Sequence, residues 1–345
     1  MKARLVLMTV GLSCTVALPL HVRAQASGPI DQGEALRRQQ EANQLLRDIK
    51  KDKVEEAPAI SPDEATDVGP QSILKTRQTH KWFAVELDTQ LYWTDNMFFN
   101  ESTPIDTVDS AVLASSAQLS LTPPHWKLGE GKLRPRLGYQ HVWMNYAVVG
   151  QRFDPTTGDR KSNGDFDAAS TFGDLTYIWG NYYAQVGFDW QRLLSHQPSY
   201  GSYSEFYRDY SPRWSLTRIF ELSEKQAIIM SYLGSHHFTE VAPTPGLNDG
   251  DRNDRTEHNL LLNYSYQVAP RLILQPGYRF QFTHYSNESR LDQLQSFSAS
   301  VIVPITSWFS ARAFAAYEFR ESDSAPIPDY RKLDTGVSLS ANFKF

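Results

Sequence analysis

The sequence predicts an all-β fold, a closed antiparallel transmembrane β-barrel of about twelve strands with a short N-terminal periplasmic helix. Three observations predict it. Residues 333–345 alternate strictly between apolar and polar side chains and end on Phe345, as a strand with one oily and one wet face does. The same period of two recurs from residue 80 onward. The connections between these segments are alternately long and short, which is typical of membrane barrels.

The N-terminus has the pattern of a secretory signal peptide. Two basic residues precede the apolar run 5–20, and small residues follow at Ala24 and Ala26. We therefore expect cleavage after one of these alanines and assign residues 1–26 to the signal. The alternative is a membrane anchor, for which Pro19 leaves the apolar run short.

Composition excludes several classes of protein. No other apolar run approaches the length of a membrane helix. The net charge of -5 gives no reason to expect nucleic acid as a partner. The single cysteine, Cys14, lies in a poor lipidation motif and would leave with the signal peptide, so no disulfide is expected.

Residues 27–79 are predicted to form a periplasmic helix and a linker. Asp31 and Glu34 fit a capping box, while the Pro-containing stretch 55–79 reads as the linker. A narrow apolar stripe follows the cap: Leu36, Ala42, Leu45, Leu46 and Ile49. So thin a stripe needs a partner, and residues 31–54 could meet the barrel mouth, a second copy or a periplasmic protein. The other interpretation is a partly disordered leader.

Residues 80–345 are predicted to form the barrel. The fourth strand alternates imperfectly, because Phe172 and Ile178 share the polar parity. The expected strands cover about 83–93, 111–121, 133–143, 169–179, 182–190, 206–219, 227–238, 260–266, 272–282, 297–305, 309–319 and 333–345.

Loop lengths predict the orientation of the barrel. Short connections are expected near 123–132, 180–181, 221–225, 267–271 and 306–308, and long ones near 94–109, 147–168, 194–204, 239–256, 286–291 and 321–331. Short turns face the periplasm in outer-membrane barrels. With an even strand count, both termini fall on that side. Closure is required, because an open sheet edge would leave unpaired backbone groups in hydrocarbon.

Aromatic residues near strand ends predict two interfacial girdles on the lipid-facing side. Arg208 and Arg218 break the apolar pattern there, but lie near the ends of their strand, where their charges can reach water. The predicted girdle residues are Trp93, Trp143, Trp179, Tyr182, Trp190, Trp214 and Phe319.

The opposite parity places charged residues of both signs inside the barrel. One interpretation is a transverse field in a narrow pore that selects polar or charged solutes; the other is a structural lattice of ion pairs that fills the lumen. Tyr92, Tyr183 and Tyr207 share this parity and could contact sugar rings or only pack the wall. The predicted lumen residues are Glu86, Asp88, Arg134, Arg136, Asp174, Asp189, Arg213, Arg279, Arg312, Glu318, Arg320 and Asp334.

The segment 284–287 contains His284 and Ser286, the minimum for acyl transfer if the histidine activates the serine. It resembles the His-x-Ser of outer-membrane lipid A deacylases and, loosely, a motif of outer-membrane phospholipases. The deacylases place a glutamate where this chain has Ser298. The third group is therefore undefined, with Glu288 and Asp292 nearby. These two residues are candidates only, and no catalytic residue is assigned.

A second motif, residues 248–254, clusters oxygen ligands in a long loop. Asp249, Asp251 and Asn253 are candidate Ca²⁺ ligands, but the EF-hand pattern fails because its glutamate position is Leu260. A solvated acidic loop is the preferred interpretation. No phosphate loop, dinucleotide motif or zinc motif is present, so no cofactor is expected.

Three features carry a family resemblance. The stretch 94–98 resembles the aspartate-asparagine-aliphatic-phenylalanine signature of a broad group of Gram-negative outer-membrane β-barrels, as do the closing hairpin 317–324 and the terminal Phe345. The resemblance implies a link to exopolysaccharide export. It also implies that the barrel-assembly machinery reads Phe345.

The function these observations favour is an outer-membrane channel or porin-like protein that passes a hydrophilic solute or polysaccharide through a charged lumen, without enzymatic activity. The alternative is a non-conducting barrel that anchors the periplasmic helix to an envelope partner. An acyl hydrolase acting on outer-leaflet lipid is the third interpretation. The expected partners are outer-membrane lipid and the assembly machinery.

Overall fold

The computed structural model describes residues 80–97, 99, 109–146, 165–195, 203–241, 253–324, 327 and 329–345. The predicted signal peptide, helix and linker lie outside these residues. Within the described part, no helix is long and apolar enough to cross a membrane.

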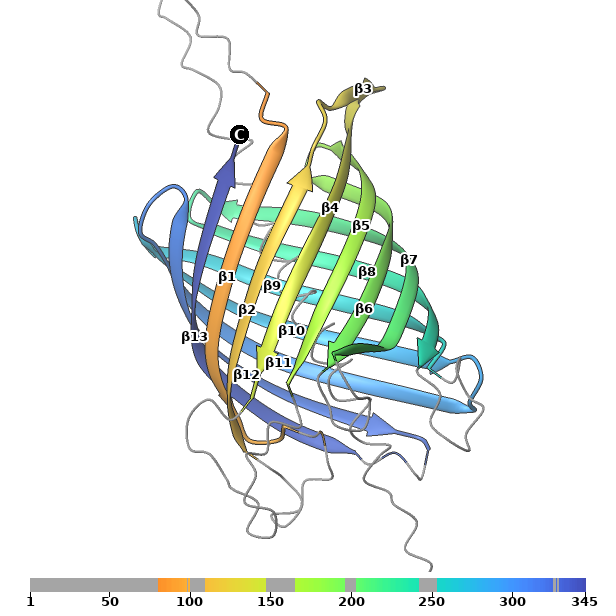
Figure 1. The fold of residues 1–345 in the computed structure, drawn as a ribbon. Coiled ribbons are helices and arrows are strands. Elements are labelled where there is room, and N and C mark those ends of the chain that lie inside the picture. The colour runs from red at the N-terminus through yellow and green to blue at the C-terminus, as the bar shows by residue number, and fades with distance from the viewer. Residues whose placement is uncertain are drawn as a thin grey trace, which may run out of the picture.

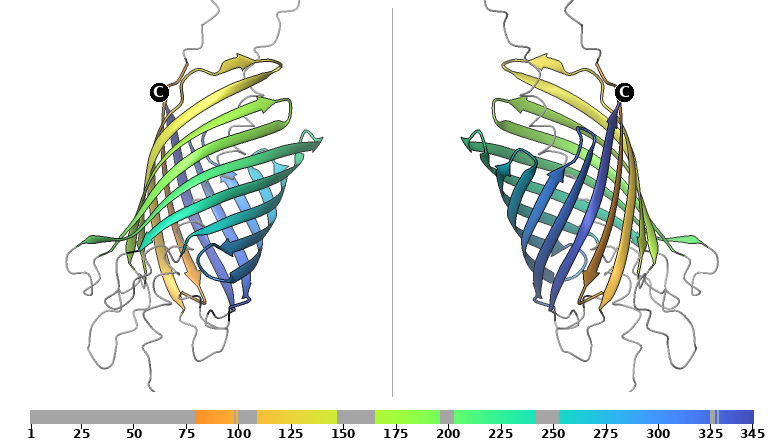
Figure 2. Two further views of the ribbon diagram at one scale, coloured as in Figure 1. Left: turned by 90° about the vertical axis from the view of Figure 1, so that its right-hand side faces the viewer. Right: turned by 90° about the vertical axis from the view of Figure 1, so that its left-hand side faces the viewer.

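The structure consists of antiparallel strands that follow one another around a tilted tube (Figures 1 and 2). Twelve long strands form the wall, and β3 is a three-residue strand beside β4. Their bounds are β1 Phe83–Thr94, β2 Ser110–Leu121, β3 Trp126–Leu128, β4 Gly131–Asn145, β5 Phe166–Trp179, β6 Tyr182–Ser195, β7 Ser204–Ser223, β8 Gln226–Val241, β9 Arg255–Ala269, β10 Leu272–Tyr285, β11 Arg290–Pro304, β12 Phe309–Ser322 and β13 Tyr330–Lys344.

The barrel is closed between its first and last strands. β1 pairs with β13 in a register that joins Ala84 to Lys344, and β2 pairs with β4 across the short β3 excursion. Every wall strand therefore has two neighbours, as a sheet in hydrocarbon requires. The predicted closed twelve-stranded barrel is confirmed. The prediction missed β3, which lies in the segment 123–132 that was expected to be only a turn.

Consecutive wall strands meet at two ends of the tube, called here the turn end and the loop end. The two-residue connections 180–181, 224–225 and 270–271 lie at the turn end, and the longest connections lie at the loop end. The connection between β10 and β11, predicted to be long, has only the four residues 286–289, as many as the turn 305–308. The start of β1 and the end of β13 lie together at the turn end (Figure 1). Reciprocal backbone hydrogen bonds between Phe83 and Phe345 join them there.

The outer face is apolar because alternate side chains point away from the tube. Large apolar residues in mid-wall expose 51–58% of their surface: Leu119, Val186, Leu260, Phe297 and Val337. Their neighbours of opposite parity are polar and buried, such as Gln118, Asn259 and Ser338. Apolar groups outside and polar groups inside are the pattern of a barrel surrounded by lipid.

Ring pairs mark the ends of the outer face. Trp179 stacks on Tyr182 at the turn end, with ring centroids 5.2 Å apart, and Trp190 stacks on Tyr210 at 6.5 Å nearer the loop end. Trp214 departs from the predicted girdle. It lies in the middle of the twenty-residue β7 and packs over Gly234, where a Cβ would meet the indole at 2.3 Å.

Both outward arginines of β7 lie near strand ends, as predicted. Arg218 at the turn end stacks over Tyr182 and Phe220, at 4.8 and 4.4 Å from the ring centroids. Arg208 at the loop end makes ion pairs with Glu205 at 2.7 Å and with Glu240 at 3.2 Å. Each charge therefore has a local partner where the wall leaves the apolar belt.

Candidate functional site: the lumen wall

All twelve predicted lumen residues lie at inward-facing positions of the alternating strands. Phe172, which broke the fourth strand's pattern, also points inward. It packs where Gly138 leaves space, because a Cβ on this glycine would lie 2.3 Å from the Phe172 ring. The Arg136 guanidinium lies over the same ring at 5.0 Å.

Four charged residues, one on each strand, form a ladder across β4 to β7 in mid-wall. Arg136 donates two hydrogen bonds to Asp174 Oδ2, at 2.8 and 3.0 Å. Arg213 Nη2 donates to the same oxygen at 3.3 Å, and its Nε lies 2.8 Å from Asp189 Oδ2 in an ion pair without hydrogen-bond geometry. The carboxylate side chains are 1% and 2% exposed. We call these four residues the charge ladder.

A buried polar network lies on β7, β8 and β9 near the loop end. His237 Nδ1 lies 2.6 Å from Asp209 Oδ2, and Ser211 Oγ donates to Asp209 Oδ1 at 2.7 Å. The other ring nitrogen of His237 lies 2.9 Å from Ser235 Oγ and 3.8 Å from Glu257 Oε1. The order Asp209–His237–Ser235 resembles a hydrolytic triad. However, Glu257 shares the ring nitrogen with the serine, and the imidazole is fully buried, so the arrangement stabilises the wall.

Arg255 extends this network. Its Nε donates to Glu257 at 2.7 Å, and its Nη1 donates to the Tyr207 hydroxyl at 3.2 Å. The network therefore contains two carboxylates, Asp209 and Glu257, and two basic side chains, His237 and Arg255. Because each carboxylate lies beside a basic group, the cost of burying the charges is compensated locally.

A second network lies on β10 to β13. Glu318 accepts hydrogen bonds from Arg279 and, at 2.8 Å, from the Tyr330 hydroxyl. Lys332 makes an ion pair with Asp334 at 3.1 Å. On β11, Arg290 and Asp292 form a further buried ion pair, and Arg320 on β12 lies 3.9 Å from the same aspartate.

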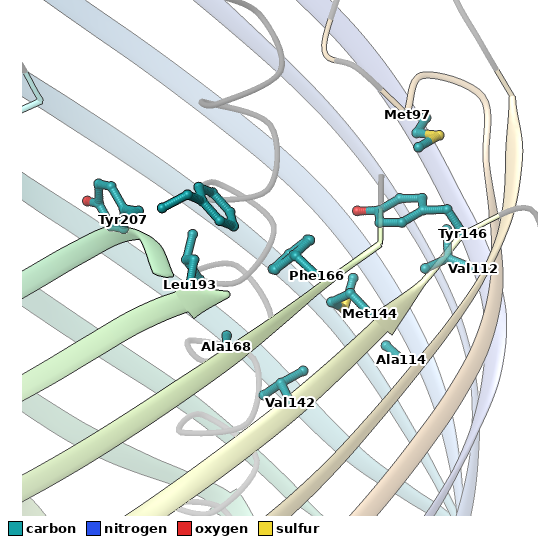
Figure 3. Close-up of a cluster of buried hydrophobic side chains, with 11 residues drawn as sticks. Met97, Val112, Ala114, Val142, Met144, Tyr146, Phe166, Ala168, Leu193 and Tyr207 are labelled. Carbon is teal, nitrogen blue, oxygen red and sulfur yellow. The ribbon is translucent and has the colours of Figure 1, made fainter. Parts of the chain in front are cut away.

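Between these networks, the loop-end wall of β2 and β4 to β7 is apolar inside. Figure 3 shows these side chains directed from the strands into the barrel. Val112 and Leu193 are completely buried, and Met144 and Tyr207 are 1% exposed. We call this set the apolar arc: Met97, Val112, Ala114, Val142, Met144, Tyr146, Phe166, Ala168, Leu193, Phe206 and Tyr207. It was not predicted, since both parities of β2 and β4 are partly apolar here.

Several charged lumen residues were also missed: Arg255, Glu257, Arg290, Asp292, Lys332 and His237. The signal was present, because all of them except His237 continue the inward parity of a predicted strand beyond its expected end, and His237 lies within the predicted strand 227–238. The strands were predicted too short at the loop end. There polar residues replace the outward apolar ones, and alternation becomes hard to recognise.

His284 lies on the outer face at the loop end, and Ser286 follows directly after β10. In the described structure no hydrogen bond joins their side chains. Asp292 faces inward and pairs with Arg290, so it is unavailable to orient His284. Of the candidate calcium ligands, Asp249 and Asp251 lie outside the described residues, and the Asn253 carbonyl accepts a hydrogen bond from Arg255.

At the loop end of the outer face, Tyr203 donates a 2.6 Å hydrogen bond to Asp167. Partial burial of the phenol, together with this bond to a carboxylate, raises the pKa of Tyr203 to about 12.

No family model and no curated protein matches the chain. Similar solved structures include an outer membrane channel from Pseudomonas putida F1 (11% identity, 77% of this chain and 97% of that chain, TM-score 0.45). A bacterial polysaccharide outer membrane secretin is 8% identical over 77% of this chain and 99% of its own, with a TM-score of 0.42. The NanC porin is 9% identical over 74% and 98%, with a TM-score of 0.39.

The closed strand register, the apolar outer face and the polar inner face together give the chain the architecture of an outer-membrane β-barrel.

Proposed function

We propose that this protein is an outer-membrane channel that passes a hydrophilic solute or polysaccharide through its charged lumen, with both termini in the periplasm. The observation that carries the proposal is the charge ladder, because it aligns cations and anions across four adjacent strands of the inner wall. Arg136 is 20% exposed and can meet a passing solute directly, and the buried carboxylates of Asp174 and Asp189 contribute to the field across the lumen.

Selection in this channel is steric and electrostatic, with no covalent step. Twelve strands enclose less space than the sixteen or more of open porins, so side chains decide the free cross-section. The loop-end half presents charged networks on β7 to β13 and the apolar arc on β2 to β7.

A specific observation favours the alternative, a non-conducting barrel that anchors residues 31–54 to an envelope partner. The polar networks at the loop end are almost completely buried: His237, Asp209 and Glu257 are at most 2% exposed. A lumen packed at this level would stabilise the barrel without conducting.

The test is single-channel conductance of the refolded protein in a planar bilayer. A channel gives discrete steps, and Asp174→Asn shifts the reversal potential in a salt gradient toward anion preference because it removes a negative charge from the wall. The matched control is Arg218→Gln, which changes an outward charge and leaves the reversal potential unchanged. Silence both with and without residues 27–79, in barrels with the heat-modifiable mobility of a folded one, would favour the anchor.

A further inference from the structure

The apolar arc is buried although its side chains face the lumen. A barrel wall is one sheet thick, so an inward side chain is covered only by its neighbours and by whatever occupies the lumen. Val112, Met144 and Leu193 come from three different strands, yet each is at most 1% exposed (Figure 3). Nearer the turn end the inward residues vary, since Gln185 and Ser215 are only partly buried whereas Thr217 and Ile219 are 1% and 4% exposed. The apolar arc is the larger of the two buried apolar clusters in the described structure.

Apolar side chains of this kind are unfavourable beside water, so an apolar segment that covers them in the lumen would be stabilised there. The chain carries a matching segment. The stripe that includes Leu45, Leu46 and Ile49 lies on one side of a predicted helix whose other faces carry both Arg and Glu. Those faces complement the charged networks on β7 to β13, which also carry both signs.

The segment can reach this position. Barrel β1 begins with Phe83 at the turn end. The connection 51–79 can extend by at most ~3.3 Å per residue, or about 95 Å in all. A twelve-residue strand such as β1 is only about 40 Å long. The linker can therefore place the helix anywhere along the lumen.

We propose that residues 31–50 dock inside the barrel as an amphipathic helix, with the apolar stripe against the apolar arc, and obstruct the lumen. The docking is inferred from the buried apolar arc and from the apolar stripe of the predicted helix. The obstruction of solute flow also rests on the proposed channel function.

Cysteine cross-linking in the full chain tests the docking, with Cys14 replaced by serine. Leu45→Cys, Leu46→Cys and Ile49→Cys are each combined with Met144→Cys on the inner wall. We expect a thiol-reactive cross-linker of short span to join at least one pair. The matched control is Trp143→Cys, the outward neighbour of Met144 on β4, which gives no product. Ala114 and Met144 are directly opposed in register. The pair Ala114→Cys with Met144→Cys is therefore the positive control, which shows that the cysteine at position 144 reacts.

If the control pair reacts and no stripe cysteine joins Met144→Cys, the docking is wrong, and a loop of the barrel becomes the occupant. Conductance tests the obstruction separately. Leu45→Asp with Leu46→Asp should raise single-channel conductance at least twofold, whereas Gln40→Asp with Gln44→Asp, on the opposite helix face, should not. Cross-linking in a barrel that never conducts would keep the docking and reject the channel. A barrel that conducts but gives no cross-link would keep the channel and reject the docking.

Discussion

Single residues on the inner wall illustrate how a barrel tolerates charge at the depth of the membrane. Asp189 is 2% exposed, and its ion pair with Arg213 compensates the loss of hydration. Arg213 also contacts Asp174, so one cation serves two carboxylates. The stability of the charge ladder should therefore depend more on Arg213 than on Arg136, which is 20% exposed and contacts only Asp174 within the ladder.

Arg213→Met should destabilise the folded barrel by about 3–5 kcal/mol, because it leaves buried carboxylates without their shared cation. Urea titration of the protein in detergent micelles, followed by tryptophan fluorescence, measures the loss. Adding Asp189→Asn to this variant should recover part of it. Arg218→Met, on the outer face, provides the control and should cost less than half as much. Equal effects of the two arginine substitutions would contradict the ladder's role.

Tyr203 provides a prediction about pH. Its pKa of about 12 lies above the ordinary value of 10.0, so folding favours the protonated phenol. The resulting stabilisation is complete below pH 10 and disappears as the pH rises through about 12. The tyrosinate absorbance of the folded wild type, minus that of Tyr203→Phe, should titrate near pH 12. Titration of this difference near pH 10 would show that the hydrogen bond to Asp167 is absent.

At the scale of elements, the seam between β1 and β13 carries extra hydrogen bonds just beyond the end of β1. The Asp95 side chain accepts a bond from the Leu333 backbone N–H at 2.7 Å, and Asn96 donates to the Arg331 carbonyl at 3.0 Å. Phe99, with a φ of 54°, turns its ring onto Tyr330 at 4.9 Å. The signature stretch 94–98 thus begins with residues that fasten the first strand to the last.

Asp95→Ala should lower stability by about 1 kcal/mol, the net contribution of such a hydrogen bond. It should also slow refolding into lipid vesicles, since closure of the barrel joins these two strands. The difference in gel mobility between heated and unheated protein reports the folded fraction. It therefore measures both the midpoint of urea unfolding and the rate of refolding. Asp323→Ala removes an equivalent 2.7 Å bond to Leu291 at the β11–β12 hairpin. Asp323→Ala should lower the unfolding midpoint as much as Asp95→Ala does, but it should leave the refolding rate unchanged.

For the whole molecule, alternation along the strands was sufficient to predict the closed barrel, the number of wall strands and the inward parity of every predicted lumen residue. The contacts among those residues could not be predicted. Arg213 meets Asp174 from two strands away, and such a contact depends on barrel shear, which no single strand encodes. The apolar arc stayed hidden for a related reason. Val112 and Met144 look like irregularities within their strands and form a surface only when the strands are aligned.

The same alternation makes a final prediction about the environment of the barrel. Leu262 lies in the middle of β9 and exposes 44% of its surface on the outer face, whereas its neighbour Leu261 points inward. In a bilayer, Leu262→Arg should cost about 2–4 kcal/mol, because it places a charge among lipid tails at mid-depth. Leu261→Arg, which directs the charge toward the polar lumen, should cost less. Equilibrium unfolding from phospholipid vesicles measures both variants. In a water-soluble barrel the order would be reversed, since Leu262→Arg would then reach solvent freely, while Leu261→Arg would add bulk to the interior.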